Sequence, residues 1–328
     1  MPIFTSLRLR LARLLDNRKY DESMGPSVAI RRRSSVRPAV RRLEPRLVLN
    51  ASAELTSLGQ LVITGTDSAD FVRLDVNQLG QITIENAFGG QIDIVGNPDG
   101  PSQPINPDAI FSKQIQINLK GGNDTLDLAI PSGINVSVVD GSGTDTIKII
   151  HPDSPLPNDT ATHRLESESI RFDSSIEPID WRNQNFQLIG DVYVGKSSSA
   201  SPSGIVIDGG SWEVSGRLIL QGEVDFLAST LGGSIDLSGA ILTADAPSTT
   251  LTLDLGHTSA AILQLGSINS SATENIENLS VVSANTVLIQ SPVFNLPGEL
   301  SIQNVSDDLI IESSLTASSI SLQASNIQ

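Results

Sequence analysis

Residues 119–127, LKGGNDTLD, and residues 140–148, DGSGTDTIK, share one pattern, and residues 65–73, GTDSADFVR, carry a third copy of it. In each copy a glycine or serine stands two residues before an aspartate, and an apolar residue stands two residues after it. Glycine allows a sharp corner, and aspartate can hydrogen-bond to its own turn or bind a hard cation. The pattern therefore predicts a turn followed by a strand.

The first two copies are in register with each other. Asp124 and Asp145 lie 21 residues apart. If one coil of a β-solenoid takes about 20 residues, the two aspartates occupy the same corner of neighbouring coils, about 4.8 Å apart. Two carboxylates this close repel each other unless a cation or water lies between them.

Short alternating segments surround these corners. Between residues 51 and 150, apolar residues take every second position of seven segments that Gly, Asn and Pro separate. Such runs are typical of short strands joined by turns. Residues 205–328 are more regular, since similar strands begin at Leu279, Leu300 and Ile320, 21 and 20 residues apart. A coil of that length cannot bury its own apolar face, so neighbouring coils must stack.

The composition agrees with thin, stacked layers. The chain of 328 residues has no Cys, and aromatic residues make up only 4% of it. Its core must therefore consist of Ile, Val and Leu, which fit stacked coils well. We predict an all-β fold, a right-handed parallel β-solenoid (β-helix) in two stretches, residues 51–150 and residues 205–328.

Residues 151–204 interrupt the pattern. Five prolines and the charged cluster Arg164–Glu168 predict an irregular insert or linker. Trp181, Phe186 and Tyr193 concentrate aromatic residues there. We expect them to form a plug packed on the end of a coil, with a ligand-binding platform as the alternative.

Charge divides the chain into a basic leader and an acidic body. Residues 1–50 hold 12 Lys and Arg against four acids, whereas residues 51–328 hold nine against 33, a balance of −24. The leader cannot bury apolar area, so we predict that it is disordered. A basic arm can bind nucleic acid, but this body would repel the phosphates, so we expect no nucleic-acid partner. No apolar run approaches the ~18 residues of a transmembrane span.

The end of the leader resembles a known motif. Residues 41–51, RRLEPRLVLNA, are similar to the LEPR-x-L-L segment of large planctomycete exoproteins. Leu43 to Arg46 match it, Val48 departs from the first family Leu, and Leu49 keeps the second. The resemblance implies that residues 1–50 are an export segment and that the protein is secreted or lies at the cell surface. It also implies continuation into calcium-binding-type repeats or autotransporter-like β-helices.

The corner motifs resemble the tail of the calcium-binding nonapeptide G-G-x-G-x-D-x-U-x of RTX-type repeats. Calcium takes six to eight oxygen ligands, which Asp124, Asp140, Asp145 and turn carbonyls could partly supply. Asp70 is a weaker candidate, because Ser68 replaces the glycine of its motif. Calcium is thus a candidate cofactor, and a plain turn of Gly and Asp is the alternative.

Catalytic motifs are missing from the sequence. His151, His163 and His257 have no metal-ligand spacing, so we expect them at the surface. There is no G-x-S-x-G elbow and no Walker or dinucleotide glycine pattern. A β-helical polysaccharide lyase would need clustered carboxylates beside an Arg or Lys base.

We therefore expect a non-catalytic, structural or adhesin-like surface protein, the N-terminal part of a larger repetitive exoprotein. The second half is similar to the passenger regions of filamentous-haemagglutinin and autotransporter adhesins. A calcium-binding solenoid module and the polysaccharide lyase are the alternatives. The expected partners are surface polysaccharide or other surface proteins. Self-association through the open end of the solenoid is also expected, because the chain ends inside a coil.

Overall fold

The computed structural model divides the chain into two units, Met1–Leu47 and Val48–Gln328, and each is considered by itself. The described residues all belong to the second unit, and they are 51–86, 89–150, 160–172, 179–195, 202–228, 230–245, 249–268, 276–291 and 294–328. The predicted leader, residues 1–50, and His151 lie outside them. Within these ranges, no helix is long and apolar enough to cross a bilayer.

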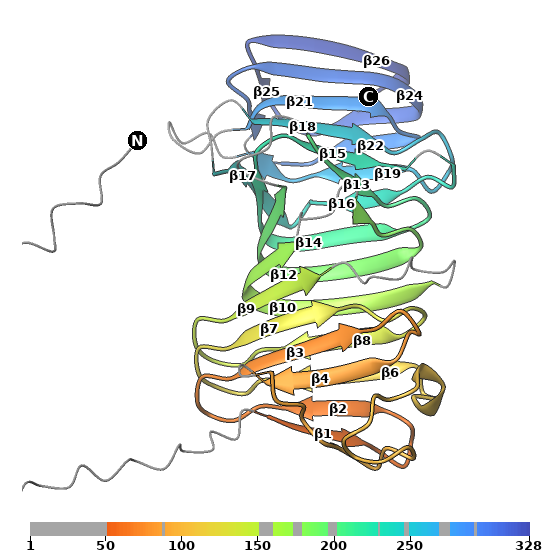
Figure 1. Cartoon of the computed structure of the whole chain (residues 1–328). Helices are drawn as coiled ribbons and strands as arrows, with labels where there is room; N and C mark the ends of the chain where they lie inside the picture. The colour runs from red at the N-terminus through yellow and green to blue at the C-terminus, as the bar shows by residue number, and fades with distance from the viewer. Residues whose placement is uncertain are drawn as a thin grey trace, which may run out of the picture. The chain divides into compact units, whose positions relative to one another are not determined.

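The body is a stack of parallel β-coils. Its 26 strands form one continuous sheet, and Figure 1 shows them as successive rungs from β1 to β26. Among the named strands, only the pairs β1–β2 and β3–β4 are antiparallel. The predicted all-β, parallel β-solenoid is confirmed.

The strands line up on three faces. The first face contains β2 (Leu61–Thr64), β6 (Gln114–Asn118), β8 (Asn135–Val139), the first parts of β10 (Ala161–Phe172), β12 (Gln184–Gly195) and β14 (Ser211–Gln221), β16 (Ser234–Asp236), β19 (Ile262–Leu265), β22 (Thr286–Ile289), and the ends of β24 (Glu299–Ile311) and β26 (Ser319–Ile327).

The second face follows in each coil. It contains β3 (Phe71–Val76), β7 (Thr125–Ala129), β9 (Thr146–Ile150), the second parts of β10, β12 and β14, β17 (Ala240–Ala244), β20 (Ser267–Ile268), β23 (Phe294–Asn295) and β25 (Leu315–Thr316). The third face contains β11 (Ile179–Asp180), β13 (Ser203–Val206), β15 (Val224–Leu227), β18 (Thr249–Asp254), β21 (Ile276–Ser283) and the first parts of β24 and β26.

Apolar side chains stack in columns inside the coils. On the second face, for example, the paired positions run from Leu126 through Ile147, Ile170, Val192 and Leu218, and all five side chains are buried. Successive strand residues point to opposite faces of a sheet, so the period-two alternation sends one apolar row inward from each strand. The buried residues form one contiguous core.

The registers inferred from the sequence are confirmed. Leu126 pairs with Ile147, which places Asp124 and Asp145 at the same corner of neighbouring coils. Leu279 pairs with Leu300 and Leu300 with Ile320.

Residues 151–204 do not separate two solenoid stretches. The described part of this range contains β10, β11 and β12, which pair in parallel with strands on both sides. The stack is therefore continuous from the first predicted stretch to the second. The number of strands per coil changes in this range. The coils of β6 to β9 contain two strands each, and from β11 on each coil has a third strand, on the third face.

Aromatic side chains fill the interior where the third face begins. Trp181 and Phe186 are buried, with ring centroids 5.3 Å apart, and Phe186 also packs against Trp212. Tyr193 points outward, and the Arg171 guanidinium lies 4.0 Å from its ring centroid. The predicted plug is therefore wrong. A coil with a third strand encloses a wider cross-section, which large rings fill.

The two ends of the stack differ. At the N-terminal end, β1 (Ser52–Leu55) folds back on β2, and β4 (Ile82–Asn86) folds back on β3. The segment between them and β6 contains β5 (Ile94–Val95), which pairs with β1, and the 3₁₀ turn η1 (Pro107–Ala109). At the other end, β26 pairs with β24 alone among the described strands.

Candidate functional site

Four carboxylates form a ladder along the corner that precedes the second face. The backbone N–H of Asp70 donates to Asp124 Oδ1 (2.7 Å), and the N–H of Asp124 donates to Asp145 Oδ1 (2.6 Å). The N–H of Asp145 donates to Glu168 Oε2 (3.2 Å). The carboxylates of Asp124, Asp145 and Glu168 thus each accept the backbone N–H of the acidic residue one coil below. An N–H at a tight corner lacks a strand partner, and the ladder supplies one.

The ladder begins in residues 65–73, the copy of the motif nearest the N-terminus. Asp70 Oδ2 accepts the backbone N–H of Thr66 at 2.5 Å, and the Thr66 hydroxyl lies 3.1 Å from the same oxygen. Asp70 thus stabilises its own turn, as expected if this copy of the motif is a plain turn and not a calcium site.

Glycine allows the coils to approach closely at this corner. At Gly141 the backbone has φ +100°, and an added Cβ would lie 1.4 Å from the carbonyl oxygen of Lys120 in the coil below. The backbones are joined there, since Gly122 N–H donates to Ser142 O (2.9 Å) and Ser142 N–H donates to Lys120 O (2.8 Å). The glycines of the motif are therefore required by packing between coils.

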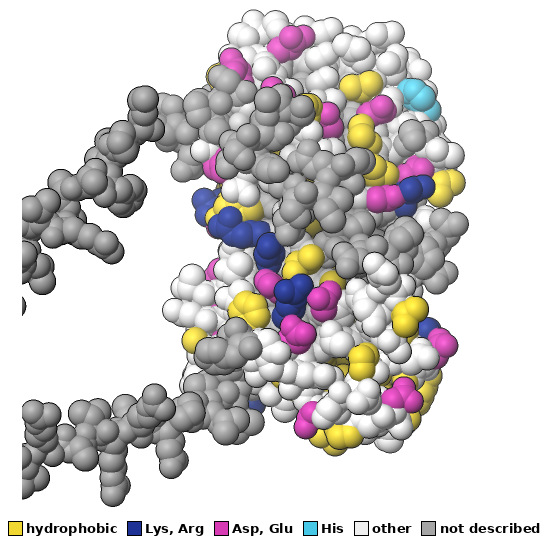
Figure 2. Space-filling view, in the orientation of Figure 1, with side chains coloured by type: hydrophobic (Ala, Val, Ile, Leu, Met, Phe, Trp, Pro, Cys, Tyr) yellow, Lys and Arg dark blue, Asp and Glu magenta, His cyan; other side chains and the backbone are white. Residues whose placement is uncertain are grey.

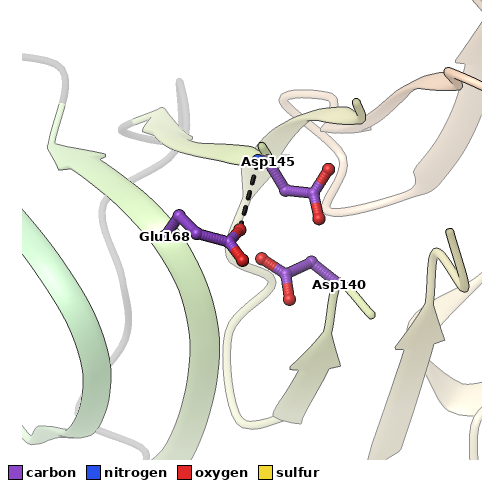
Figure 3. Close-up of side chains that lie close together, drawn as sticks. All are labelled: Asp140, Asp145 and Glu168. Carbon is purple, nitrogen blue, oxygen red and sulfur yellow. Dashed lines mark hydrogen bonds between the residues drawn. The ribbon is translucent and has the colours of Figure 1, made fainter. Parts of the chain in front are cut away.

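Three acidic side chains meet where β8, β9 and β10 approach one another. Asp140 follows β8, Asp145 precedes β9, and Glu168 lies in β10. One ligand oxygen of each lies within 4.8 Å of the others. Figure 3 shows the carboxylates of Asp140 and Glu168 facing each other, and the hydrogen bond from Asp145 to Glu168. Asp140 and Asp145 are buried, whereas Glu168 is exposed.

Burial disfavours the charged form of these groups. It raises the pKa of Asp140 from 3.8 to about 6, with the negative charges of Glu168 and Asp145 adding to the rise and a hydrogen bond with Ser167 opposing it. Burial also raises the pKa of Asp145, where the hydrogen bond from Asp124 opposes the rise. The pKa of Asp124 is raised for the same reason.

The candidate metal ligands are only partly brought together. Asp140 is in the cluster alone, Asp124 and Asp70 are in the ladder alone, and Asp145 and Glu168 belong to both. Glu168 was not predicted from the sequence, because this residue lies in a strand and follows no glycine motif. Its spacing of 23 residues from Asp145, close to one coil length, was the available signal.

His163 occupies the interior, so its predicted surface position is wrong. It stands in an inward column between Val136 and Phe186, and it is fully buried. Nε2 lies 2.9 Å from Gln184 Oε1, and burial lowers the pKa of His163 to about 4, with the Gln184 hydrogen bond opposing the shift. The neutral imidazole therefore acts as a core side chain. His257 is exposed, as expected.

A groove lies on the first face. It has a volume of about 210 Å³ and is lined by Gln60, Gln114, Ile115, Gln116, Asn135, Val136, Ser137, Thr162 and Arg164. These residues come from the loop before β2 and from β6, β8 and β10. Six of these nine residues carry an amide or a hydroxyl, which offers both donors and acceptors to a ligand, and their carbon atoms add apolar surface.

The comparisons with known proteins found no match. No protein-family model, no curated protein and no solved structure is significantly similar to this chain.

Proposed function

We propose that the chain is an exported, non-catalytic protein of the cell surface, and that its coil stack is a stiff scaffold for adhesive contacts. The resemblance of residues 41–51 to an exoprotein motif supports export. Residues 51–328 hold nine bases against 33 acids, which favours solubility and disfavours nucleic acid as a partner.

The observation that carries this proposal is the alignment of polar side chains on the first face. Gln116, Ser137, Arg164, Gln187 and Glu213 occupy one outward position on five successive strands. Neighbouring strands lie about 4.8 Å apart, so the row repeats at a regular spacing. A repeated row lets one extended ligand make many weak contacts at once.

The groove on the same face favours a neutral polysaccharide as the ligand. Its amides and hydroxyls can exchange hydrogen bonds with sugar hydroxyls, and Arg164 adds a donor that Gln187 orients through a 2.7 Å hydrogen bond. In Figure 2, most of the described surface belongs to the backbone or to side chains that are neither apolar nor charged. Such a surface suits a partner rich in hydroxyl groups.

A binding assay on insoluble polysaccharide tests the proposal. The full chain is expected to bind a neutral β-glucan or chitin, and Gln116→Ala combined with Gln187→Ala is expected to weaken binding by about tenfold, because contacts in a row act together. Thr252→Ala combined with Ser280→Ala, on the third face, is the matched control and should bind like the parent protein. Equal binding by all three proteins, or no binding by any, contradicts this function.

A second mode of contact is self-association through β26. The outer edge of this strand has no partner among the described residues, and Ile320 and Ile327 are exposed by 46% and 52%. An unpaired edge with apolar side chains can pair with another chain. We expect concentration-dependent association in analytical ultracentrifugation that Ile320→Lys abolishes. Ile241→Lys, at an equally exposed isoleucine on β17, should leave it intact.

The polysaccharide lyase is the competing function. It would need a Lys or Arg base beside clustered carboxylates, and none of the described Lys or Arg side chains pairs with Asp140, Asp145 or Glu168. Incubation with acidic polysaccharides should therefore give no unsaturated products. Their appearance would replace the adhesive function by the enzymatic one.

A further inference from the structure

The cluster of Asp140, Asp145 and Glu168 concentrates negative charge, and no Lys or Arg among the described residues forms an ion pair with it. The described ion pairs of the body use other acids, namely Asp75, Asp108, Glu166, Asp180 and Asp191. The only charged neighbours that shift the pKa of Asp140 are themselves acidic, Glu168 and Asp145. Burying carboxylates without a positive partner is unfavourable unless they bind protons or a metal ion.

Two carboxylate oxygens in the cluster are buried and have no hydrogen-bond partner within the described part of the chain. They are Oδ2 of Asp140 and Oδ2 of Asp145, and the two side chains are 4% and 0% exposed. Asp145 uses its other oxygen to accept the N–H of Asp124. A buried polar atom without a partner costs about 1–3 kcal/mol, and more when it is charged. The free oxygens therefore indicate a ligand that supplies positive charge.

We propose that Asp140, Asp145 and Glu168 bind one divalent cation and that calcium is preferred over magnesium. Their ligand oxygens lie within 4.8 Å of one another, a separation that two oxygens bound to one calcium ion at about 2.4 Å can have. Magnesium requires near-ideal octahedral geometry and gives up its water reluctantly, whereas calcium accepts irregular sets of six to eight oxygens, such as side chains from different coils supply. Carboxylates that bind through both oxygens, turn carbonyls and water complete the shell that calcium takes.

The position of the cluster explains what the ion does. It joins Asp140 and Asp145, which flank the glycine corner, to Glu168 in the next coil. Glu168 is exposed, so the ion enters from solvent without opening of the stack. The bound ion links the two-strand coils to the first coil that contains a third strand, and it stabilises this junction. This inference is independent of adhesion, because it concerns only the stability of the stack.

Calorimetry on the full chain tests the site. After treatment with EDTA and removal of the chelator, titration with calcium chloride at pH 7.5 should give one bound ion per chain. The melting temperature should rise with calcium concentration, and more than in magnesium chloride at equal ionic strength.

Three variants locate the ion. Asp145→Asn and Glu168→Gln keep an oxygen that accepts the backbone N–H but lose the charge, so each should weaken calcium binding by at least about tenfold. Asp124→Asn is the matched control, since Asp124 is equally buried and holds the equivalent place in the ladder outside the cluster. Its affinity should stay within about threefold of the parent protein. Glu168 is exposed, so Glu168→Gln tests the site even if Asp145→Asn fails to fold.

Two results would overturn the proposal. One is the absence of both binding heat and a change in melting temperature at about 10 mM calcium, above the range of weak extracellular calcium modules. The other is an equal loss of affinity in Asp124→Asn and Asp145→Asn, which would assign the effect to general negative charge along the ladder.

Discussion

The two-strand coils below residue 150 and the three-strand coils above residue 205 reach the same stacking by different means. From β6 and β7 to β8 and β9 in the lower coils, equivalent positions are 21 residues apart on both faces, as Ile115 and Val136 or Leu126 and Ile147 show. On the third face of the upper coils, the separation changes from 27 residues between Phe226 and Leu253 to 21 between Val281 and Ile302.

The difference lies in the corners. In the lower coils, one corner is fixed by glycines in close backbone contact and by the carboxylate ladder, which leaves no room for extra residues. In the upper coils, three short strands hold each coil in register, and the loops between them absorb changes in length. A fixed corner thus gives coils of constant length but requires buried carboxylates. Coils with a third face can differ in length.

The largest expected effect contrasts two glycines. Gly141→Ala should destabilise the protein by about 3–5 kcal/mol, because the residue has φ +100° and its Cβ would overlap Lys120 O. Gly239→Ala in the upper coils should cost less than about 1 kcal/mol, because the nearest atom would be at 3.4 Å. Urea unfolding measures both. Similar losses would show that the lower corner is not the more constrained one.

The junction between the two regions should respond to pH through His163. Its pKa is lowered to about 4 in the folded state from 6.5, so unfolding binds a proton and stability falls as pH drops below 6.5. Between pH 7.5 and pH 4 the contribution is about 3 kcal/mol. His163→Leu should flatten the pH dependence of the melting temperature, whatever its effect at neutral pH.

His257→Leu is the control for this measurement, since His257 is exposed. It should leave the slope of the pH dependence unchanged. A His163→Leu protein that keeps the slope of the parent would show that the imidazole is charged in the fold or titrates outside the core.

The ladder gives the next effect in size. Asp124→Ala leaves the buried N–H of Asp70 without its acceptor and should cost about 1–3 kcal/mol. Asp124→Asn keeps the acceptor and should recover most of this loss. If the Ala and Asn variants are equally stable in urea unfolding, the hydrogen bond does not stabilise the corner.

The smallest expected effect is at Asn278 in the upper coils, a neutral side chain that accepts a backbone N–H as the ladder carboxylates do. Asn278 Oδ1 accepts the N–H of Glu299 at 2.9 Å, at a position that solvent reaches. Asn278→Ala should cost only about 0.5–1 kcal/mol, because water can replace the lost acceptor. A loss as large as that of Asp124→Ala would remove the contrast between a buried charged corner and an exposed neutral one.

The sequence predicted the parts of the fold that repeat. Asp124 and Asp145, and Leu279, Leu300 and Ile320, repeat at one coil length because each residue must meet its equivalent in the next coil. The third face could not be predicted in the same way. It begins with β11, a strand of two residues, where neither periodicity nor length is informative.

The candidate site was predicted in part for a related reason. Asp140 and Asp145 belong to a motif with glycines, whereas Glu168 is one polar residue in a long strand and joins them only through pairing of β9 with β10. The inward position of His163 was visible in the alternation of Ala161, His163 and Leu165. The prediction of a surface position came instead from the lack of metal-ligand spacing around the histidine, which says nothing about burial.

The fold-back pairs β1–β2 and β3–β4 have a consequence for how the chain acquires its structure. Each joins residues that are close in sequence, and hairpins of this kind form within about 1–10 μs. Every later rung needs a loop of a whole coil to close, which is slower. We therefore expect these hairpins to form early and to serve as a template on which the following rungs add.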